Sequence, residues 1–281
     1  NPGVNNLARI NGGLAFTVSG GSITFDGGAT SEWRVGQGEF TIGDNTPEAS
    51  VVNIHSGTVS TGSWVSIGRG NGTTGLQSGL NITGGRLSTG HLYTGYFNNV
   101  SGYNTRPFIN ASGNAVIDVT DDFRMSESVG SLTTVNLSDN STLNINDRLE
   151  LGWGGRAVMN IKDNATVRVS SFGVGHGTNA VGNQGAGAIY QSGGSLSRSG
   201  VGGGGDWRIG GAMALAGTIN MNDALVWGLY QISGGTLNTG AQNLQIGGNG
   251  RGVLDVRGSG VVDTNNGAGF IVVGRYAGSY G

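Results

Sequence analysis

The densest group of ionisable side chains in the sequence comprises Asp118, Asp121, Asp122 and Arg124. Two carboxylates can cleave a glycosidic bond when one donates a proton and the other acts as base or nucleophile. Clustered carboxylates can also hold Ca²⁺ while a neighbouring arginine serves as a base. The simpler interpretation is a solvated corner between two strands, in which Arg124 points outward and neutralises the acids. We expect this simpler arrangement.

Metal ligation is not indicated by the remaining candidate ligands. His55, His91 and His176 lie far apart in the sequence and have no i, i+4 spacing. Residues 247–252 nearly match the calcium-binding nonapeptide Gly-Gly-x-Gly-x-Asp, but the sixth position is Gly252. The chain has no cysteine, which excludes disulfides, a thiol nucleophile and cysteine-based zinc sites. We therefore expect no catalytic residue, no metal and no cofactor.

The elements that position these residues must fold with few charges. The 281 residues include 58 Gly and 3 Pro; 36% are hydrophobic, 11% are charged, and the net charge is −2. This composition excludes collagen, which needs a three-residue glycine period, and disorder, which needs high charge. No basic stripe suggests nucleic acid, and no run of 18 apolar residues suggests a membrane-spanning helix. The first residues lack a basic-then-apolar leader, so we expect any signal peptide to have been removed.

A repeat with a mean period of about 30 residues runs along the chain. Its first element reads bulky-x-aliphatic-Gly, and Ser126 replaces the glycine once. The second element reads aliphatic-Asn-aliphatic and ends in a tight turn of Gly, Asn or Asp; the third is another alternating strand. The first element occurs at 33–36, 65–68, 92–95, 123–126, 149–152, 172–175, 207–210, 244–247 and 271–274.

Three short strands cannot bury a core alone, but stacked units bury one continuous apolar column. We therefore predict an all-β parallel β-helix, a solenoid of about nine coils with roughly 30 residues and three strands per coil. Residues 1–281 form one domain, with 1–14 an N-terminal edge segment, 15–274 the repeats and 270–281 an incomplete last coil. A β-propeller fits less well, because units as short as 23 residues are too small for a blade.

Alternation within the first element assigns its side chains to the interior or to solvent. The predicted core ladder consists of Trp33, Ile67, Phe123, Leu151, Phe172, Trp207 and Ile246. The residues predicted to point outward between them are Arg34, Arg124, Glu150, Arg208 and Gln245.

The second element predicts a column of stacked, hydrogen-bonded amides, as in cross-β structures. Binding of sugar hydroxyls along this column is the less favoured alternative. This ladder would consist of Asn53, Asn81, Asn110, Asn136 and Asn160. Elsewhere the same column would hold Thr17, Tyr190, Tyr230 and Asp255. The turn that follows is predicted to need positive φ at Gly85, with Asn140 and Asn164 at the aligned corner.

Two phrases carry a resemblance to a known group of proteins: residues 246–256, Ile-Gly-Gly-Asn-Gly-Arg-Gly-Val-Leu-Asp-Val, and residues 80–87, Leu-Asn-Ile-Thr-Gly-Gly-Arg-Leu. They resemble the β-strand repeats of bacterial autotransporter passengers and of exported surface proteins with a PEP-type sorting signal. The likeness extends from about Phe16 to Gly274. It implies a bacterial, exported, right-handed parallel β-helix used as a surface stalk, adhesin or matrix component. The membrane barrel and the sorting tail of those families are absent from this sequence.

Pectin hydrolases of the β-helix fold provide a test for catalysis. They carry Asn-Thr-Asp, Asp-Asp, Gly-His-Gly and Arg-Ile-Lys on neighbouring coils. This chain has Asp121-Asp122 and a glycine on each side of His176, but the partner motifs read Asn104-Thr105-Arg106 and, at 208–210, Arg-Ile-Gly. The third carboxylate and the lysine are missing, so the sequence does not favour an enzyme.

Longer units place loops at one corner of the solenoid, where binding residues are often found. The loop from 96 to 108 holds Tyr96, Phe97, Tyr103 and Arg106 among Asn and Gly, a set suited to carbohydrate or protein contact. Folding back over the strands is the alternative for these side chains.

The sequence therefore favours a noncatalytic extracellular or cell-surface structural protein: a stalk, adhesin or filament subunit. Its expected partners are other copies of itself, end to end or laterally, or surface polysaccharide, with no nucleic acid and no membrane insertion. The alternative is a carbohydrate-active β-helix enzyme or a phage-type tailspike. A cleft lined by three or more carboxylates would favour that alternative.

Overall fold

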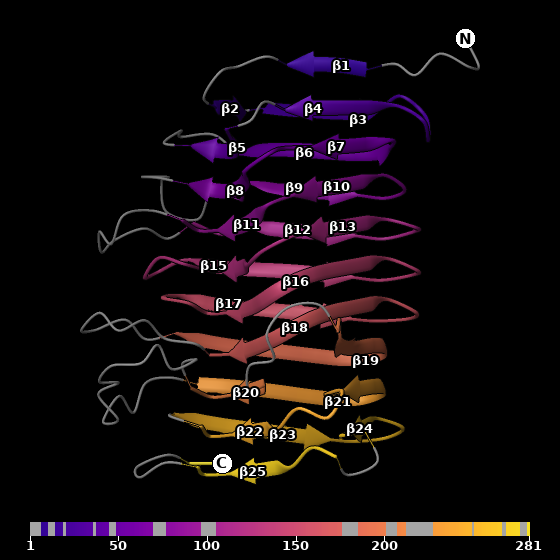
Figure 1. Cartoon of the computed structure of the whole chain (residues 1–281). Coiled ribbons are helices and arrows are strands. Elements are labelled where there is room, and N and C mark those ends of the chain that lie inside the picture. The colour runs from indigo at the N-terminus through magenta and orange to yellow at the C-terminus, as the bar shows by residue number, and fades with distance from the viewer. Residues whose placement is uncertain are drawn as a thin grey trace.

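The computed structural model describes residues 7–10, 15–18, 21–35, 38–44, 49–69, 77–96, 105–175, 185–200, 207–211, 227–248, 250–265, 268–275 and 280–281. Their strands pair in parallel and stack into a β-solenoid (Figure 1). β1 (Leu7–Ile10) lies at one end of the stack and β25 (Ile271–Val273) at the other. The predicted all-β parallel β-helix is confirmed. The described residues contain no helix with the length and apolarity to cross a membrane.

Each coil contributes a strand, or half of a longer strand, to each of three faces. Face 1 holds the bulky-x-aliphatic-Gly elements. Its strands are β2 (Ala15–Val18), β5 (Glu39–Asp44), β8 (Trp64–Arg69), β11 (His91–Thr94), β14 (Phe123–Met125), the second halves of β16 (Thr142–Leu151) and β18 (Thr166–Val174), β20 (Trp207–Ile209), β22 (Leu244–Ile246) and β25.

Face 2 holds the Asn elements, and face 3 the strands that close each coil. The face 2 strands are β3 (Gly21–Asp26), β6 (Ser50–Ser56), β9 (Gly79–Ile82), β12 (Phe108–Ala111), β15 (Leu132–Leu137), β17 (Arg156–Ile161), the first halves of β19 (Ala186–Arg198) and β21 (Trp227–Asn238), and β23 (Arg251–Val256). The face 3 strands are β1, β4 (Glu32–Val35), β7 (Thr58–Ser60), β10 (Arg86–Thr89), β13 (Val116–Val119), the remaining halves of β16, β18, β19 and β21, and β24 (Val261–Asp263).

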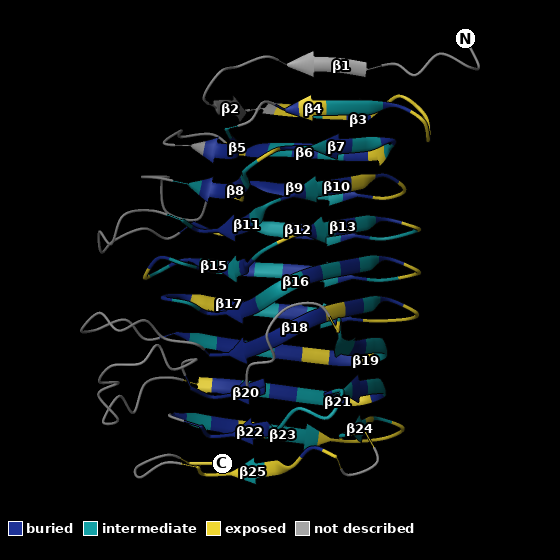
Figure 2. Cartoon of the chain, in the orientation of Figure 1, coloured by how far each residue is buried: buried dark blue, intermediate teal, exposed yellow. Residues whose placement is uncertain are grey.

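One apolar column fills the interior of the solenoid (Figure 2). On face 1 the inward side chains lie in register from coil to coil, and Phe172 packs edge-on against Trp207 with ring centroids 4.7 Å apart. Of the predicted core ladder, six residues are buried in this column: Ile67, Phe123, Leu151, Phe172, Trp207 and Ile246. The first and third positions of the face 1 element therefore both supply inward side chains.

Trp33 and Arg34 lie on face 3 and not, as predicted, in the bulky-x-aliphatic-Gly element of face 1. Arg34 is exposed, as predicted, and Trp33 is partly buried and packs against the core. Trp33 is opposite Val59 and Arg34 opposite Ser60, since β4 pairs with β7. The face 1 element of that coil is β5, in which residues 40–43 read Phe-Thr-Ile-Gly and pair with β8. Residues 33–36 match the same pattern, and the pattern alone does not distinguish one face from another.

The N-terminal register also differs from the prediction. β1 pairs with β4, so the stack already begins within residues 1–14. Thr17 lies opposite Thr41 on face 1 instead of in the Asn column. The face 2 residue opposite Asn53 is Thr24.

The residue after each inward pair of face 1 has a left-handed backbone. The φ angles lie between 55° and 76° at Gly43, Gly68, Gly95, Ser126, Gly152, Gly175, Gly210, Gly247 and Gly274. Glycine adopts this conformation without a Cβ penalty, which explains its recurrence. Ser126 is tolerated because its buried hydroxyl accepts a bond from the Thr133 N–H at 2.8 Å and donates to the Arg156 carbonyl.

The face 2 turns do not place positive φ at Gly85, Asn140 or Asn164, contrary to the prediction. In these aligned turns it falls on the first residue, at Asp139 (55°) and Asp163 (54°), whereas the later turns place it on their second glycine, at Gly194 (59°) and Gly235 (80°). Gly85 is small for another reason: a Cβ built there would lie 2.4 Å from Ile54 Cγ2 on the preceding coil.

Candidate functional site

The outward side of face 1 carries the ionisable residues that the sequence singles out, but in its middle coils it is not a solvated corner. Glu150 and Gln245 are fully buried and Arg208 is 7% exposed, although alternation turns all three away from the core. The prediction that these side chains point into solvent was therefore wrong. Charges on this surface are shielded from water, so their contribution to the free energy of folding depends on whether each has an oppositely charged partner.

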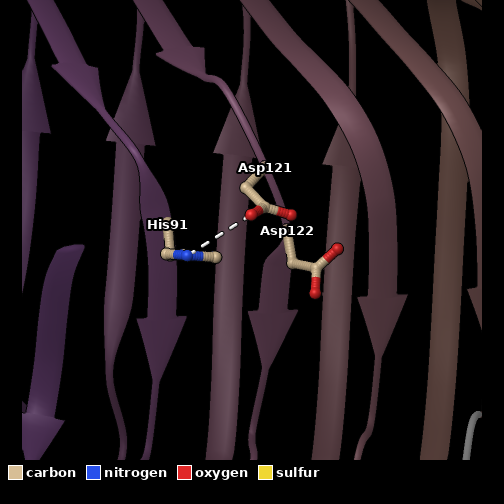
Figure 3. Close-up of side chains that lie close together, drawn as sticks. All are labelled: His91, Asp121 and Asp122. Atoms are coloured by element: carbon tan, nitrogen blue, oxygen red, sulfur yellow. Dashed lines mark ion pairs between the residues drawn. The ribbon is translucent and has the colours of Figure 1, made fainter. Parts of the chain in front are cut away.

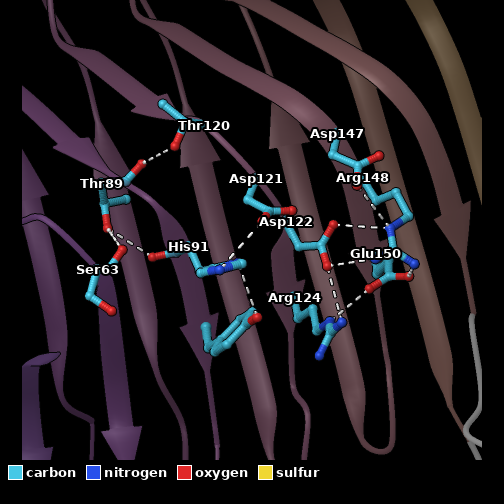
Figure 4. Close-up of polar contacts among 11 residues, drawn as sticks. Ser63, Thr89, His91, Thr120, Asp121, Asp122, Arg124, Asp147, Arg148 and Glu150 are labelled. Atoms are coloured by element: carbon cyan, nitrogen blue, oxygen red, sulfur yellow. Dashed lines mark hydrogen bonds and ion pairs between the residues drawn. The ribbon is translucent and has the colours of Figure 1, made fainter. Parts of the chain in front are cut away.

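Asp122 is the centre of an ion-pair network (Figure 4). It follows β13, directly precedes β14, and is 2% exposed. Arg148, one coil along, donates from Nε to Oδ1 at 3.0 Å and from Nη2 to Oδ2 at 2.9 Å. Arg124 also donates from Nη2 to Oδ2, at 3.0 Å. Two guanidinium groups thus engage both carboxylate oxygens, the two-pronged geometry that suits arginine.

Two glutamates complete the network around Arg124. Its Nε donates to Glu150 Oε2 at 3.0 Å, and its Nη1 lies 3.5 Å from Glu127 Oε1. Burial raises the pKa of Glu150 to about 7, and the attraction of Arg124 and Arg148 offsets this only in part. Burial likewise raises the pKa of Glu127 to about 7 against the opposing effect of Arg124. Both carboxyls therefore titrate near neutrality.

Two aromatic rings lie close to the same arginine. The Arg124 guanidinium lies 4.3 Å from the ring centroid of Trp153 and 5.2 Å from that of Tyr93, distances at which a cation attracts a ring face. Tyr93 packs against Trp64 and Tyr96, with centroids 5.4 and 5.9 Å apart, and burial raises the Tyr93 pKa to about 12. A stack of rings and guanidinium runs along the axis on this side.

His91 forms the edge of the network (Figure 3). Its Nε2 lies 3.4 Å from Asp121 Oδ2, and its Nδ1 lies 3.2 Å from the Tyr93 hydroxyl. One ligand atom each from His91, Asp121 and Asp122 lies within 4.8 Å of the others, close enough to hold a metal ion. Asp122, however, accepts bonds from two arginines on both oxygens, and their positive charge opposes a cation. This set of donors fits an ion-pair network better than a metal centre.

Asp118 does not join Asp121 and Asp122. It lies on the outward side of face 3, where it pairs with Arg86 and accepts a bond from Asn144 Nδ2 at 2.8 Å. The acidic cluster expected from the sequence is thus divided between two faces. His176 lies outside the described residues.

The four predicted binding residues are not gathered into one site among the described residues. Tyr96 contacts Trp64 and lies under Arg69, whose guanidinium is 5.8 Å from the Tyr96 ring centroid. Arg106 is exposed and lines a groove on the outward side of face 2. Phe97 and Tyr103 lie outside the described residues.

The amide column lies on the same outward side of face 2. Each Asn donates from Nδ2 to the Oδ1 of the Asn one coil earlier, at 2.9, 3.0, 2.8 and 2.8 Å in turn, through Asn53, Asn81, Asn110, Asn136 and Asn160. Tyr190 continues the column and Gln231 follows it, donating to Asp255 at 2.8 Å. Placing Tyr230 there was wrong: it is fully buried and donates to Gln191 Oε1 at 2.6 Å.

Arg148, Glu127, Trp64 and Trp153 are site residues that the sequence reasoning did not single out. Arg124 and Glu150 occupy the same repeat position in consecutive coils, so the repeat already places them side by side. Arg148 precedes Leu149 as Asp122 precedes Phe123, and this shared position signals their pairing. Glu127 and Trp153 follow the strands, where the repeat has no fixed position.

Comparison with protein-family models, curated protein sequences and solved structures gives no match to this chain.

Proposed function

We propose that this chain is a noncatalytic structural solenoid that acts outside the cell as a surface stalk, adhesin or filament subunit. One observation carries the proposal: the polar side chains suited to chemistry bind one another from coil to coil. Asp122 holds Arg148 and Arg124 holds Glu150 across neighbouring coils, and the amides of face 2 do the same. Such pairs tie neighbouring coils together and engage the carboxylates of Asp122 and Glu150 with arginines.

The extracellular location rests on the repeat. The β-strand phrases resemble those of bacterial autotransporter passengers and sorting-signal surface proteins, and the stacked coils are compatible with their stalk architecture. The chain has no cysteine, so it has no thiol that the oxidising conditions outside the cell could convert to a disulfide.

The filament form of the proposal draws on the parallel stacking of the strands. Each coil pairs strand to strand with the next along the axis, and an exposed strand edge pairs readily with another strand. A head-to-tail contact of this kind between copies would grow into a fibre.

An enzyme acting on polysaccharide is the second candidate, and the two glutamates favour it. A carboxyl that titrates near 7 is suited to general acid catalysis at neutral pH. Against it, Glu150 is fully buried and Asp122 is held by two arginines.

One experiment separates the two candidates. The purified chain is incubated with a panel of acidic and neutral polysaccharides between pH 5 and pH 8, and reducing ends and unsaturated products are measured. The structural proposal predicts no turnover. The variant Glu150→Gln should change the free energy of unfolding, and it should show no turnover either. Product release that disappears in Glu150→Gln or Asp122→Asn, with the fold intact, would establish the enzyme instead.

A further inference from the structure

A groove lies on the outward side of face 2, away from the ion-pair network. It has a volume of about 330 Å³, and its lining residues come from the coils of β9, β12 and β15. These three coils follow one another in the stack (Figure 1). Its lining combines one aromatic ring, one guanidinium, amides and a hydroxyl: Phe108, Arg106, Gln77, Asn110, Asn136 and Thr134, with Pro107 and Leu132 beside them. This mixture of an apolar platform and converging polar groups is typical of small-molecule and sugar sites.

Phe108 forms a flat platform in the groove. It pairs in register with Gly79, and a Cβ built at Gly79 would lie 2.5 Å from three atoms of its ring, Cδ1, Cδ2 and Cε1. Equal distances to three ring atoms mean that one face of the ring lies flat on Gly79. The opposite face turns toward the next coil, where Phe108 is in register with Thr134, another residue of the groove lining. Pyranose rings present a face of C–H groups that packs on such an aromatic surface.

The amide ladder leaves half of its hydrogen-bonding capacity unused. A side-chain amide has two N–H donors and two acceptor lone pairs. Asn110 uses one donor toward Asn81 and one lone pair toward Asn136. Asn136 does the same toward Asn110 and Asn160. Each therefore keeps one donor and one acceptor for a ligand, a combination that matches vicinal hydroxyls of a sugar.

Two exposed arginines lie where strands of this face begin. Arg106 precedes β12 and Arg156 opens β17. The strands β9, β12, β15 and β17 contain no Asp or Glu, and exposed Asp139 and Asp163 lie at the opposite end, in the turns after β15 and β17. Arg156 pairs in register with Leu132, the residue that separates it from Arg106 along the axis. The two arginines thus lie two strand spacings apart, about 9–10 Å. An anionic chain laid along the axis meets both.

We propose that this groove binds a carboxylated polysaccharide, with a sugar ring stacked on Phe108, its hydroxyls on Asn110 and Asn136, and its carboxylates on Arg106 and Arg156. A carboxylated glycan presents sugar rings, hydroxyls and carboxylates along one chain, and the groove offers an aromatic ring, amides and arginines that can bind them. The inference rests on the proposed function in expecting binding without cleavage.

Isothermal titration calorimetry with oligogalacturonates of defined length tests the assignment. Wild type should bind them and bind the fully methyl-esterified forms at least about tenfold more weakly, because a charge-assisted hydrogen bond is lost. Arg106→Gln should weaken oligogalacturonate binding by about tenfold and leave the esterified forms unchanged. Phe108→Ala should weaken both ligands, and Phe108→Tyr should restore them.

Arg168→Gln is the matched control, because Arg168 is also exposed but lies on face 3. Its affinity should equal that of wild type, and thermal unfolding should confirm that every variant is folded. Poly-glutamate, which has the carboxylates without the rings, should not bind in the groove. Equal losses in Arg106→Gln and Arg168→Gln, tight poly-glutamate binding that depends on Arg106, or no oligogalacturonate binding by a folded wild type would each overturn the proposal. Cleavage of the bound oligomer would instead contradict the noncatalytic function.

Discussion

Faces 1 and 2 of this solenoid obey the same register, yet their outward surfaces differ in chemistry. On face 1 the stacked positions hold Asp122, Arg124, Arg148 and Glu150, which are charged and largely buried. On face 2 they hold neutral amides that are half-buried and joined by bonds of 2.8–3.0 Å. On both faces, parallel stacking places a polar side chain beside its partner on the next coil. The contribution of each pair to stability then depends on how far the pair is buried.

The difference has an energetic meaning. A buried ion pair gains little over apolar packing, but losing one partner leaves an uncompensated charge and costs several kcal/mol. A half-exposed amide can exchange its lost bond for water, so each rung contributes only about 1 kcal/mol. Substitutions on face 1 and changes of pH should therefore alter the stability strongly. Substitutions on face 2 should alter it little, and the amides there keep exposed hydrogen-bonding groups for a ligand.

The largest effect is expected for Arg124→Ala. This change removes the shared partner of Asp122, Glu127 and Glu150 and should lower the free energy of unfolding by about 3–5 kcal/mol at pH 8. Urea denaturation measures it, with Arg168→Ala on face 3 as the control, expected to change stability by less than about 0.5 kcal/mol. Comparable losses in the two variants would remove the distinction between the network and an ordinary exposed arginine.

The next effect is on the pH dependence of stability. Glu127 and Glu150 have folded pKa values of about 7, above the ordinary value of 4.5, so between those pH values the folded state binds more protons than the unfolded state. The free energy of unfolding should therefore fall as pH rises from about 4.5 to 7 and level off above it, by roughly 1.4 kcal/mol per pKa unit for each group at most. The double variant Glu127→Gln, Glu150→Gln should flatten this slope in denaturation curves at several pH values. If the free energy of unfolding of the wild type instead increased over this interval, the pKa values of Glu127 and Glu150 would not be raised by burial.

On face 2 the corresponding substitution should be mild. Asn136→Ala interrupts the ladder between Asn110 and Asn160 and should cost about 1 kcal/mol. Asn164→Ala, at an exposed corner where the amide contact is 3.3 Å, serves as the comparison and should cost less than about 0.5 kcal/mol. Denaturant titration of both variants checks the ranking, and the reverse order would show that the ladder is not stabilising.

The last effect has the opposite sign. Gln245 is fully buried on the outward side of face 1, and neither polar atom of its side chain has a hydrogen-bond partner in the described structure. Gln245→Met keeps the shape and removes the unsatisfied amide, so it should raise the free energy of unfolding by about 1 kcal/mol. Calorimetric melting of the variant measures this gain. A clear loss of stability would mean that the amide contributes a bond on this surface.

Much of the fold follows from the repeat, and the reasons for the failures are physical. Alternation and the recurrent glycine predict the inward ladder through Phe123, Phe172 and Trp207, because burial at period two leaves a direct trace in sequence. Trp33 was misassigned because face 3 strands obey the same alternation. Tyr230 was misassigned because a one-residue change of register turns a side chain from the outside to the core.

The candidate site was less predictable. The sequence indicates which residues stack, as for Asn53 through Asn160, but not whether an outward position is covered. Glu150 and Gln245 looked like solvent-facing residues because the repeat encodes direction and not burial. The groove at Arg106 depends on how Phe108 lies on Gly79, a contact across coils that a single strand does not reveal.

A double-mutant cycle between Arg124 and Glu150 tests most directly the claim that the chemically competent residues hold neighbouring coils together. The free energies of unfolding of wild type, Arg124→Met, Glu150→Gln and the double variant are measured by urea denaturation at pH 8. The structure predicts a coupling energy of about 1.5–3 kcal/mol, because the two side chains share a 3.0 Å bond in a desolvated layer. A coupling below about 0.3 kcal/mol, the level of independent sites, would contradict the account.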